Sequence, residues 1–326
     1  MTKTIITIDI NAISTHAELI SHFIPSKNFT NNDHVLVKIN LNIFGLLLPD
    51  YLLLIACYLK HLKTICALVE IEFIDFKPLS ERTQYASRVN FFKNIEYKYE
   101  ENYSRHDSNG RFTEISCFDK NNSLVLFKSI MTILIKNKIN DDLLIALDFC
   151  LWEIIDNTIN HSERSFTYSG KGYVCAQFYP WKQEIRIIIA DSGIGIHSAL
   201  TSYPGSIYSE LNEKEAVLYS VNKGVTNGVG MGFGLWATAE LIKENRGQLI
   251  IHSGNYILDT NSEDIIQHSS HWQGTYTFLK INTANKINYS GVFNNKEERI
   301  NQLNDLKEEL NNVPKQEINN DLIDLW

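Results

Sequence analysis

The chain of 326 residues has little cysteine, little proline and no long uninterrupted apolar run. Its five cysteines form no C-x-x-C pair and are odd in number, which favours a reduced intracellular compartment over a disulfide framework. The most apolar stretch, 43–59, is interrupted by Pro49 and Asp50, so its pieces are shorter than the roughly 20 residues that a membrane helix needs. Because Met1 leads into a short strand-like run, we also expect no signal peptide. These absences predict a soluble, cytoplasmic protein without a membrane segment.

Positive charge is also scarce. A net charge of −8 leaves no overall basic field, so nucleic acid is not indicated as a partner. The P-loop pattern G-x-x-x-x-G-K-[ST] is absent, so any phosphate group would have to be held by another loop together with a metal ion. The remaining composition, 44% hydrophobic and 21% charged, is typical of globular proteins, and a chain of this length predicts two domains.

The segment 142–161 combines an apolar face with a polar stripe. The apolar face recurs at helical spacing and consists of Leu147, Leu151, Ile154 and Thr158. The polar stripe follows the same spacing and consists of Glu153, Asn157, Asn160 and His161. Acidic residues just before this segment suit the positive end of a helix dipole. The pattern predicts a helix whose polar stripe is either the wall of a polar pocket or a solvated face.

A second motif follows the strand-like run 185–190. Asp191 comes directly after this run, and Gly193 and Gly195 follow at alternate positions. A carboxylate here can accept a hydrogen bond from an adenine amino group, and glycines let the backbone approach a flat base. The alternative is an Asx turn that ends the strand.

A third motif has glycine at every second position from Gly228 to Gly234 and opens a helix-like stretch, 236–245. Backbone N–H groups in such a loop, together with the positive end of the helix dipole, can form an anion site. A flexible surface loop is the alternative. Further on, Gly274 and Thr275 precede a strand that continues to Ile281.

In this order the motifs resemble those of the GHKL ATP-binding superfamily, which includes gyrase-type topoisomerases, mismatch-repair ATPases, histidine kinases and anti-sigma serine kinases. The matching strings are Glu153-x-x-x-Asn157-x-x-x-His161, Asp191-x-Gly193-x-Gly195, Gly230-x-Gly232-x-Gly234-Leu235 and Gly274-Thr275. The resemblance covers about residues 125–283. It implies an α/β sandwich in which a mixed sheet is covered on one face by helices near 125–136, 142–161 and 235–246.

The resemblance also implies ATP and Mg²⁺ as ligands. Asn157 would supply an oxygen to Mg²⁺, and Glu153 would orient or deprotonate a water molecule, or else serve as a structural or metal-shell carboxylate. The residues expected to contact the nucleotide or its metal are Asn157, Asn160, His161, Asp191, Gly193, Gly195, Lys223, Gly230, Gly232, Gly234, Leu235 and Thr275.

Three of these expectations have alternatives. Asn160 departs from the family pattern, because many relatives carry Lys or Arg at this place. His161 either contacts a phosphate or caps its helix. Lys223 is the best-placed cation of an expected lid, 196–229, or else a solvated lysine. We expect the lid to become ordered when a triphosphate binds.

Residues 1–120 are expected to form an α/β regulatory or interaction domain of their own. The strand-like runs are 4–8, 35–39 and 67–73, and the helix-like runs are 51–62 and 81–92. The tracts 44–54 and 85–92 resemble STAS-like domains. Residues 96–122 read as a loop or linker, and 284–326 read as a polar, partly helical tail that is either a frayed extension or a partner-binding segment.

These features leave three functions open. The first is slow ATP hydrolysis that drives a switch of the lid and of a protein partner, bound through the amino-terminal domain or the tail. The second is an anti-sigma-type protein kinase that phosphorylates a separate protein, and the third is an adaptor that binds nucleotide without turnover. A histidine autokinase is disfavoured because no phosphoacceptor helix pair precedes residue 125, and a topoisomerase-like protein because no transducer domain is expected after Ile281.

Overall fold

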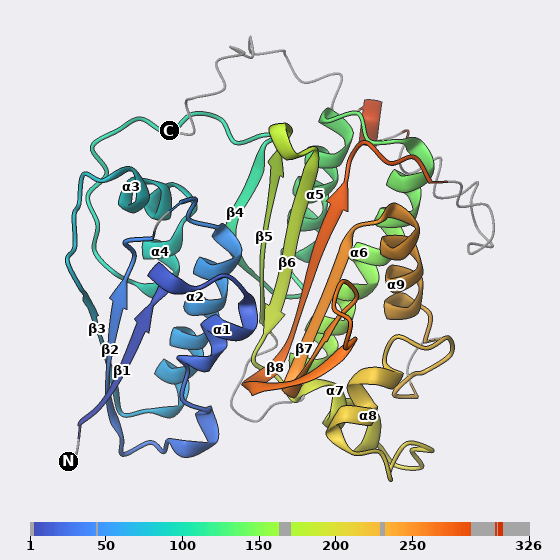
Figure 1. Cartoon of the computed structure of the whole chain (residues 1–326), viewed down its shortest axis with the longest axis horizontal. Coiled ribbons are helices and arrows are strands. Elements are labelled where there is room, and N and C mark those ends of the chain that lie inside the picture. The colour runs from blue at the N-terminus through green and yellow to red at the C-terminus, as the bar shows by residue number, and fades with distance from the viewer. Residues whose placement is uncertain are drawn as a thin grey trace.

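The computed structural model describes residues 3–43, 45–162, 171–228, 232–287, 304 and 306–308. The first part of the chain contains a three-stranded parallel sheet in the order β1-β2-β3, accompanied by short and long helices (Figure 1). Its elements are β1 (Lys3–Asp9), η1 (Ile10–Ala12), α1 (His16–Ser21), η2 (Ser26–Asn28), β2 (His34–Asn40), α2 (Pro49–Ile65), β3 (Leu68–Phe73), α3 (Glu81–Arg88) and α4 (Phe91–Ile95). The predicted strands are confirmed. The predicted helix 81–92 is interrupted, because Asn90 adopts a left-handed φ of 64° between α3 and α4.

The second part contains a five-stranded sheet in the order β4-β5-β6-β8-β7. Its strands are β4 (Phe112–Phe118), β5 (Gly172–Tyr179), β6 (Glu184–Asp191), β7 (Gln248–Asp259) and β8 (Ile266–Asn282), with η3 (Pro180–Lys182) between β5 and β6. Every neighbouring pair is antiparallel, so the predicted mixed sheet is wrong. The reason is that β8 returns from its hairpin with β7 and inserts between β7 and β6. The predicted linker 96–122 is also wrong in part, because β4 forms the edge of this sheet.

Helices cover one face of the five-stranded sheet as predicted (Figure 1). They are α5 (Ser123–Lys136), α6 (Asp141–Ser162) and α9 (Gly234–Asn245), and the lid region between β6 and α9 carries α7 (Gly195–Thr201) and α8 (Glu213–Tyr219). Helix α6 starts where its sequence predicts: the Asn140 side chain accepts a hydrogen bond from the Leu143 N–H, and Asp141 and Asp142 occupy the first turn. Its apolar face, with Leu147 and Leu151, belongs to the core beneath the sheet.

The opposite face of this sheet is covered by the first part of the chain. Helix α2 begins with Pro49 at its first position, and its side chains from Tyr51 to Leu59 are all buried. A helix that is buried all round must be enclosed by protein, and α2 packs on β3 as well as on β5 and β6, while α1 packs on β8. The two sheets therefore share one apolar core, which includes Val37 on β2 and Phe278 on β8.

The structure also bears on the remaining sequence predictions. Among the described residues, no helix combines the length and the apolar character that crossing a membrane requires. The predicted tail lies mostly outside the described residues. Within it, Leu306 contacts the core and the Lys307 ammonium group lies 2.7 Å from the Asp141 carboxylate at the start of α6.

Candidate functional site

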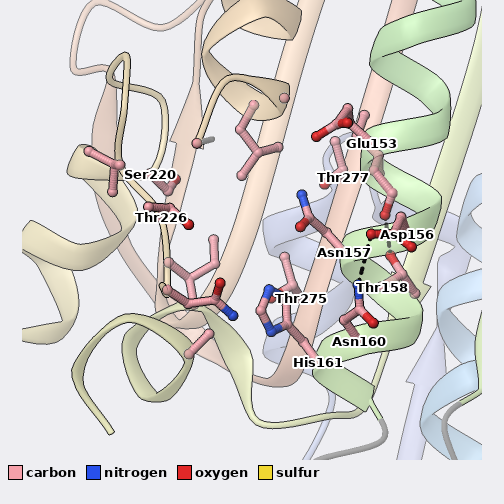
Figure 2. A pocket seen from close by; sticks show the side chains of 18 of the residues that line it. Glu153, Asp156, Asn157, Thr158, Asn160, His161, Ser220, Thr226, Thr275 and Thr277 are labelled. Atoms are coloured by element: carbon pink, nitrogen blue, oxygen red, sulfur yellow. Dashed lines mark hydrogen bonds between the residues drawn. The ribbon is translucent and has the colours of Figure 1, made fainter. Parts of the chain in front are cut away.

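A cavity of about 650 Å³ opens between α6, the start of α9, the lid region, the end of β6 and the middle of β8 (Figure 2). Its volume falls within the range of about 300–1,000 Å³ that is usual for small-molecule sites. Nine of the residues predicted from the sequence line it: Glu153, Asn157, Asn160, His161, Asp191, Gly232, Gly234, Leu235 and Thr275. Segments that are far apart in the sequence therefore meet at one place.

Helix α6 forms one wall of the cavity. Glu153, Asn157 and His161 lie one above the other along the helix and line the cavity, which is the arrangement that i, i+4 spacing imposes (Figure 2). Asn160 also lines the cavity, and its side chain is held along the helix because its Nδ2 donates to Asp156 Oδ2 at 2.8 Å. The polar stripe is thus a pocket wall and not a solvated face.

Asp191 lies at the buried end of the cavity and is only 2% exposed. Burial raises the pKa of its carboxyl group to about 7, although hydrogen bonds from the backbone N–H groups of Gly193 and Thr275 lower it. The Gly193 N–H donates to Asp191 Oδ1 at 2.7 Å. The carboxyl group is therefore an oriented hydrogen-bond acceptor in a water-poor environment.

The turn that follows Asp191 packs without room for side chains. A Cβ atom added to Gly193 would lie 2.7 Å from the His161 carbonyl oxygen, and one added to Gly274 would lie 2.5 Å from Asp191 Oδ1. Gly274 also has a φ of +86°, which disfavours other residues. Gly193 and Gly195 were predicted to contact a ligand, but their positions serve the packing of this turn and neither lines the cavity.

At the other end, α9 begins beside Glu153. A Cβ atom on Gly234 would lie 2.9 Å from Glu153 Oε2, so this carboxylate lies next to the first turn of α9. Gly232 precedes that turn with a φ of +67°, and a Cβ atom there would lie 2.4 Å from the Val225 carbonyl oxygen. The predicted contact at Gly230 lies outside the described residues. The described part of the glycine motif therefore joins the helix start to the lid.

Contacts within the lid region, together with contacts to β7, keep the lid in place. His197 Nε2 lies 2.9 Å from the Leu211 carbonyl oxygen, and Glu213 in α8 accepts hydrogen bonds from the backbone and side chain of Asn255 on β7. The Gly224 N–H donates to the Gly232 carbonyl oxygen at 2.9 Å. These contacts hold the lid over the cavity.

Lys223 does not line the cavity. Its Nζ lies 4.8 Å from the centre of the Trp236 ring and 5.7 Å from that of the Phe233 ring, which is cation–π geometry. The predicted candidate cation therefore contacts aromatic rings at the start of α9 in this structure.

Several lining residues were not singled out in the sequence. They are chiefly apolar or lid residues: Phe149, Ile196, Leu200, Ser220, Val225, Thr226, Asn227 and Thr277. Two of them carry a signal that could have been used. Phe149 precedes Glu153 by one helical turn on the same stripe, and Thr277 lies two residues after Thr275 on the same face of β8. The lid residues carry no such periodicity.

The side-chain oxygens that line the cavity suit a cation that prefers oxygen ligands and binds together with a phosphate ligand. Among the residues that the structure describes, no group of three or more His, Cys, Asp or Glu side chains could hold a metal ion alone. Asn157 offers a side-chain carbonyl oxygen at the cavity wall. Mg²⁺ commonly takes one or two protein oxygens, several waters and substrate phosphates, so it would fit such a site.

No protein-family model, curated protein or solved structure matches this chain.

Proposed function

We propose that the cavity binds ATP with Mg²⁺ and that the second part of the chain is a GHKL-type nucleotide-binding unit. The observation that carries the proposal is the meeting of Asn157, Asp191 and the Gly232–Leu235 segment on one cavity of about 650 Å³. These are three of the motifs whose order along the chain resembles that superfamily, and the helices of the α/β sandwich lie where the resemblance implies them.

The buried end suits the adenine base. An amino group donates hydrogen bonds, and Asp191 accepts them. Since this acceptor is withdrawn from water and already oriented by the Gly193 N–H, a base that donates to it gains a hydrogen bond without reorganising the site. Thr275 lies beside it, since the Thr275 N–H donates to the Asp191 carboxyl group. Its hydroxyl group donates to Ser253 Oγ at 3.3 Å, and the hydroxyl oxygen can accept a hydrogen bond from the same base.

The opposite end suits the phosphates. The first turn of α9 and the backbone around Gly232 and Gly234 face the cavity, and unpaired N–H groups at a helix start favour anions. Asn157 would hold Mg²⁺ through its side-chain oxygen. The ion would supply positive charge that offsets the charge of the phosphates.

Glu153 is placed to act on water near the terminal phosphate, since its carboxylate lies beside the first turn of α9. In the proposed reaction a water oxygen attacks the γ-phosphorus, the bond to the β–γ bridging oxygen breaks, and ADP and inorganic phosphate leave. Glu153 accepts the proton that the water loses. The lid, whose Val225 contacts Gly232, would convey the presence of the γ-phosphate to a protein partner.

The test measures binding and turnover separately. The wild-type protein is expected to bind ATP more tightly with Mg²⁺ than with a chelator in calorimetric titration, and to release phosphate slowly. Glu153→Gln should retain binding within about three-fold and lose phosphate release by about 100-fold, because removal of a general base typically costs about 10²–10⁴-fold. Absence of ATP binding by the wild type would refute the proposal.

The same assay distinguishes the two alternative functions, a protein kinase and an adaptor that binds nucleotide without turnover. Labelled γ-phosphate that appears on a co-purified protein, and not as free phosphate, would indicate a protein kinase of the anti-sigma type. Binding without any phosphate release or transfer would indicate a nucleotide-sensing adaptor. In both cases the site remains a nucleotide site and only the chemistry changes.

A further inference from the structure

The back of the 191–195 turn is held by two side chains of β8. Trp272 Nε1 donates to the Asp191 carbonyl oxygen at 3.2 Å, and Gln273 Nε2 donates to the Gly193 carbonyl oxygen at 2.6 Å. Trp272 is 3% exposed, so the first of these bonds is shielded from water. The two carbonyl groups belong to the residues on either side of Ser192, and β8 therefore fixes both ends of this short backbone segment.

The first part of the chain contacts the same segment. Ser26, in η2, donates from its Oγ to Gln273 Oε1 at 3.4 Å, and Cys57 Sγ, in α2, lies 3.4 Å from Ser192 Oγ. All three of Ser26, Cys57 and Ser192 are buried. A short chain of contacts thus runs from η2 through Gln273 to the turn whose first residue is Asp191.

We infer that Gln273 is a positioning residue for the nucleotide base, and that through Ser26 it makes the first part of the chain a support of the base-binding turn. Gln273 does not line the cavity. It acts on the ligand by fixing the backbone that orients Asp191, since groups behind a binding residue determine how closely that residue keeps its productive geometry. The inference rests on the proposed function.

The test compares two glutamines on the same strand. Gln273→Met keeps the length of the side chain and the net charge but removes the donor to the Gly193 carbonyl oxygen. Gln267→Met is the matched control, because Gln267 Nε2 also donates to a backbone carbonyl oxygen, that of Asp264, at 3.2 Å, far from the turn along β8. The affinities of ATP and GTP are measured for each protein by calorimetry.

The ratio of the two affinities separates positioning from folding. Guanine presents an acceptor where adenine presents its amino group, so in the same pose GTP lacks the hydrogen bond to Asp191 whose geometry Gln273 would maintain. Gln273→Met should lower the ATP-to-GTP affinity ratio by about five-fold, the value of one net hydrogen bond, and Gln267→Met should leave it unchanged. A purely structural effect would lower the melting temperature or the active fraction and would leave the ratio as it is.

A second variant covers the case in which Gln273→Met does not fold. Ser26→Ala removes one hydroxyl group from η2 and should lower the ratio by about two-fold, because its bond to Gln273 is long. An unchanged ratio in folded Gln273→Met, or in Ser26→Ala if the first variant is unfolded, overturns the inference. If the wild-type protein binds ATP, the proposed function stands whichever ratio the variants give. If it binds no nucleotide, both the proposed function and the role of Gln273 are wrong.

Discussion

The two ends of the cavity are built in different ways. At the buried end, Asp191 is 2% exposed, and the turn after it is packed so closely that a Cβ atom at Gly193 or Gly274 would collide with neighbouring backbone. At the other end, the wall is the lid, which meets the start of α9 where Val225 touches Gly232 and Gly224 bonds to it. The buried end is held by the sheet and by the layers packed on its two faces. The wall of the other end is the segment that connects α8 to α9.

This difference indicates a division of roles within the proposed site. Substitutions at the buried end should change the affinity for every adenine compound, because they alter the base contact alone. Substitutions at the lid end should change the affinity for the triphosphate and leave adenosine unaffected. Each prediction below tests one side of this comparison.

The largest effect is expected for Asp191→Asn. The variant replaces an acceptor by a group that can turn a donor toward the adenine amino group, so we expect the affinities for ATP, ADP and adenosine to fall together by at least about 100-fold, the cost of a lost charged hydrogen bond and an unpaired donor. Calorimetric titration with the three ligands measures this. A loss confined to ATP would place Asp191 at the phosphate end and contradict the division.

The same variant should gain stability relative to the wild type as the pH rises. Burial raises the Asp191 pKa from 3.8 to about 7, so the folded state favours the neutral carboxyl group. The stability that it contributes is complete below the unfolded-state pKa and is lost as the pH rises through about 7. Chemical denaturation should therefore find the variant gaining on the wild type by up to a few kcal/mol between pH 4 and pH 8. A difference in unfolding free energy between the two proteins that stays constant from pH 4 to pH 8 would contradict the raised pKa.

The pKa also predicts how ligand binding depends on pH in the wild type. A base that donates to Asp191 favours the ionised carboxylate, so binding should strengthen as the pH rises from about 6 to 8 and should release a proton. Titrations in buffers of different ionisation enthalpy measure that proton. Adenosine, which lacks titrating phosphates, is the ligand that isolates the effect of Asp191.

Gly232→Ala should act on the lid end with a smaller effect. The added Cβ would lie 2.4 Å from the Val225 carbonyl oxygen, so the lid must move. We expect the affinity for ATP to fall by about ten-fold, or roughly 1.4 kcal/mol, with adenosine unchanged. Gly224→Ala is the control, because its φ of +81° is just as unfavourable for alanine but nothing lies within 4 Å of the new atom. Equal losses in both variants would assign the effect to backbone strain and not to the lid contact.

The sequence predicted those parts of the site that depend on local pattern. The spacing of Glu153, Asn157 and His161 places them on one side of a helix whatever the rest of the chain does. The position of Asp191 follows in the same way from the buried strand before it. Long-range contacts carry no such signal: Gln273 and Gly193 are 80 residues apart. The covering of the second sheet face by α1 and α2 likewise depends on which apolar surfaces meet, since any buried sheet would suit an all-apolar helix.

The smallest effect is expected for Lys223→Met, which tests whether this lysine of the lid contacts the phosphates at all. Its Nζ lies over the Trp236 and Phe233 rings, and exposed cation–π contacts contribute about 0.5–1 kcal/mol. If Lys223 stays on these rings when ATP binds, the affinity for ATP should change by less than about three-fold, and only the melting temperature should fall slightly. If Lys223 moves to the phosphates, the loss should exceed ten-fold for ATP and be absent for adenosine, because a charge-assisted hydrogen bond contributes about 1.5–3 kcal/mol. The first outcome would assign the balance of phosphate charge to groups other than Lys223, such as the backbone at the start of α9, Mg²⁺ and His161.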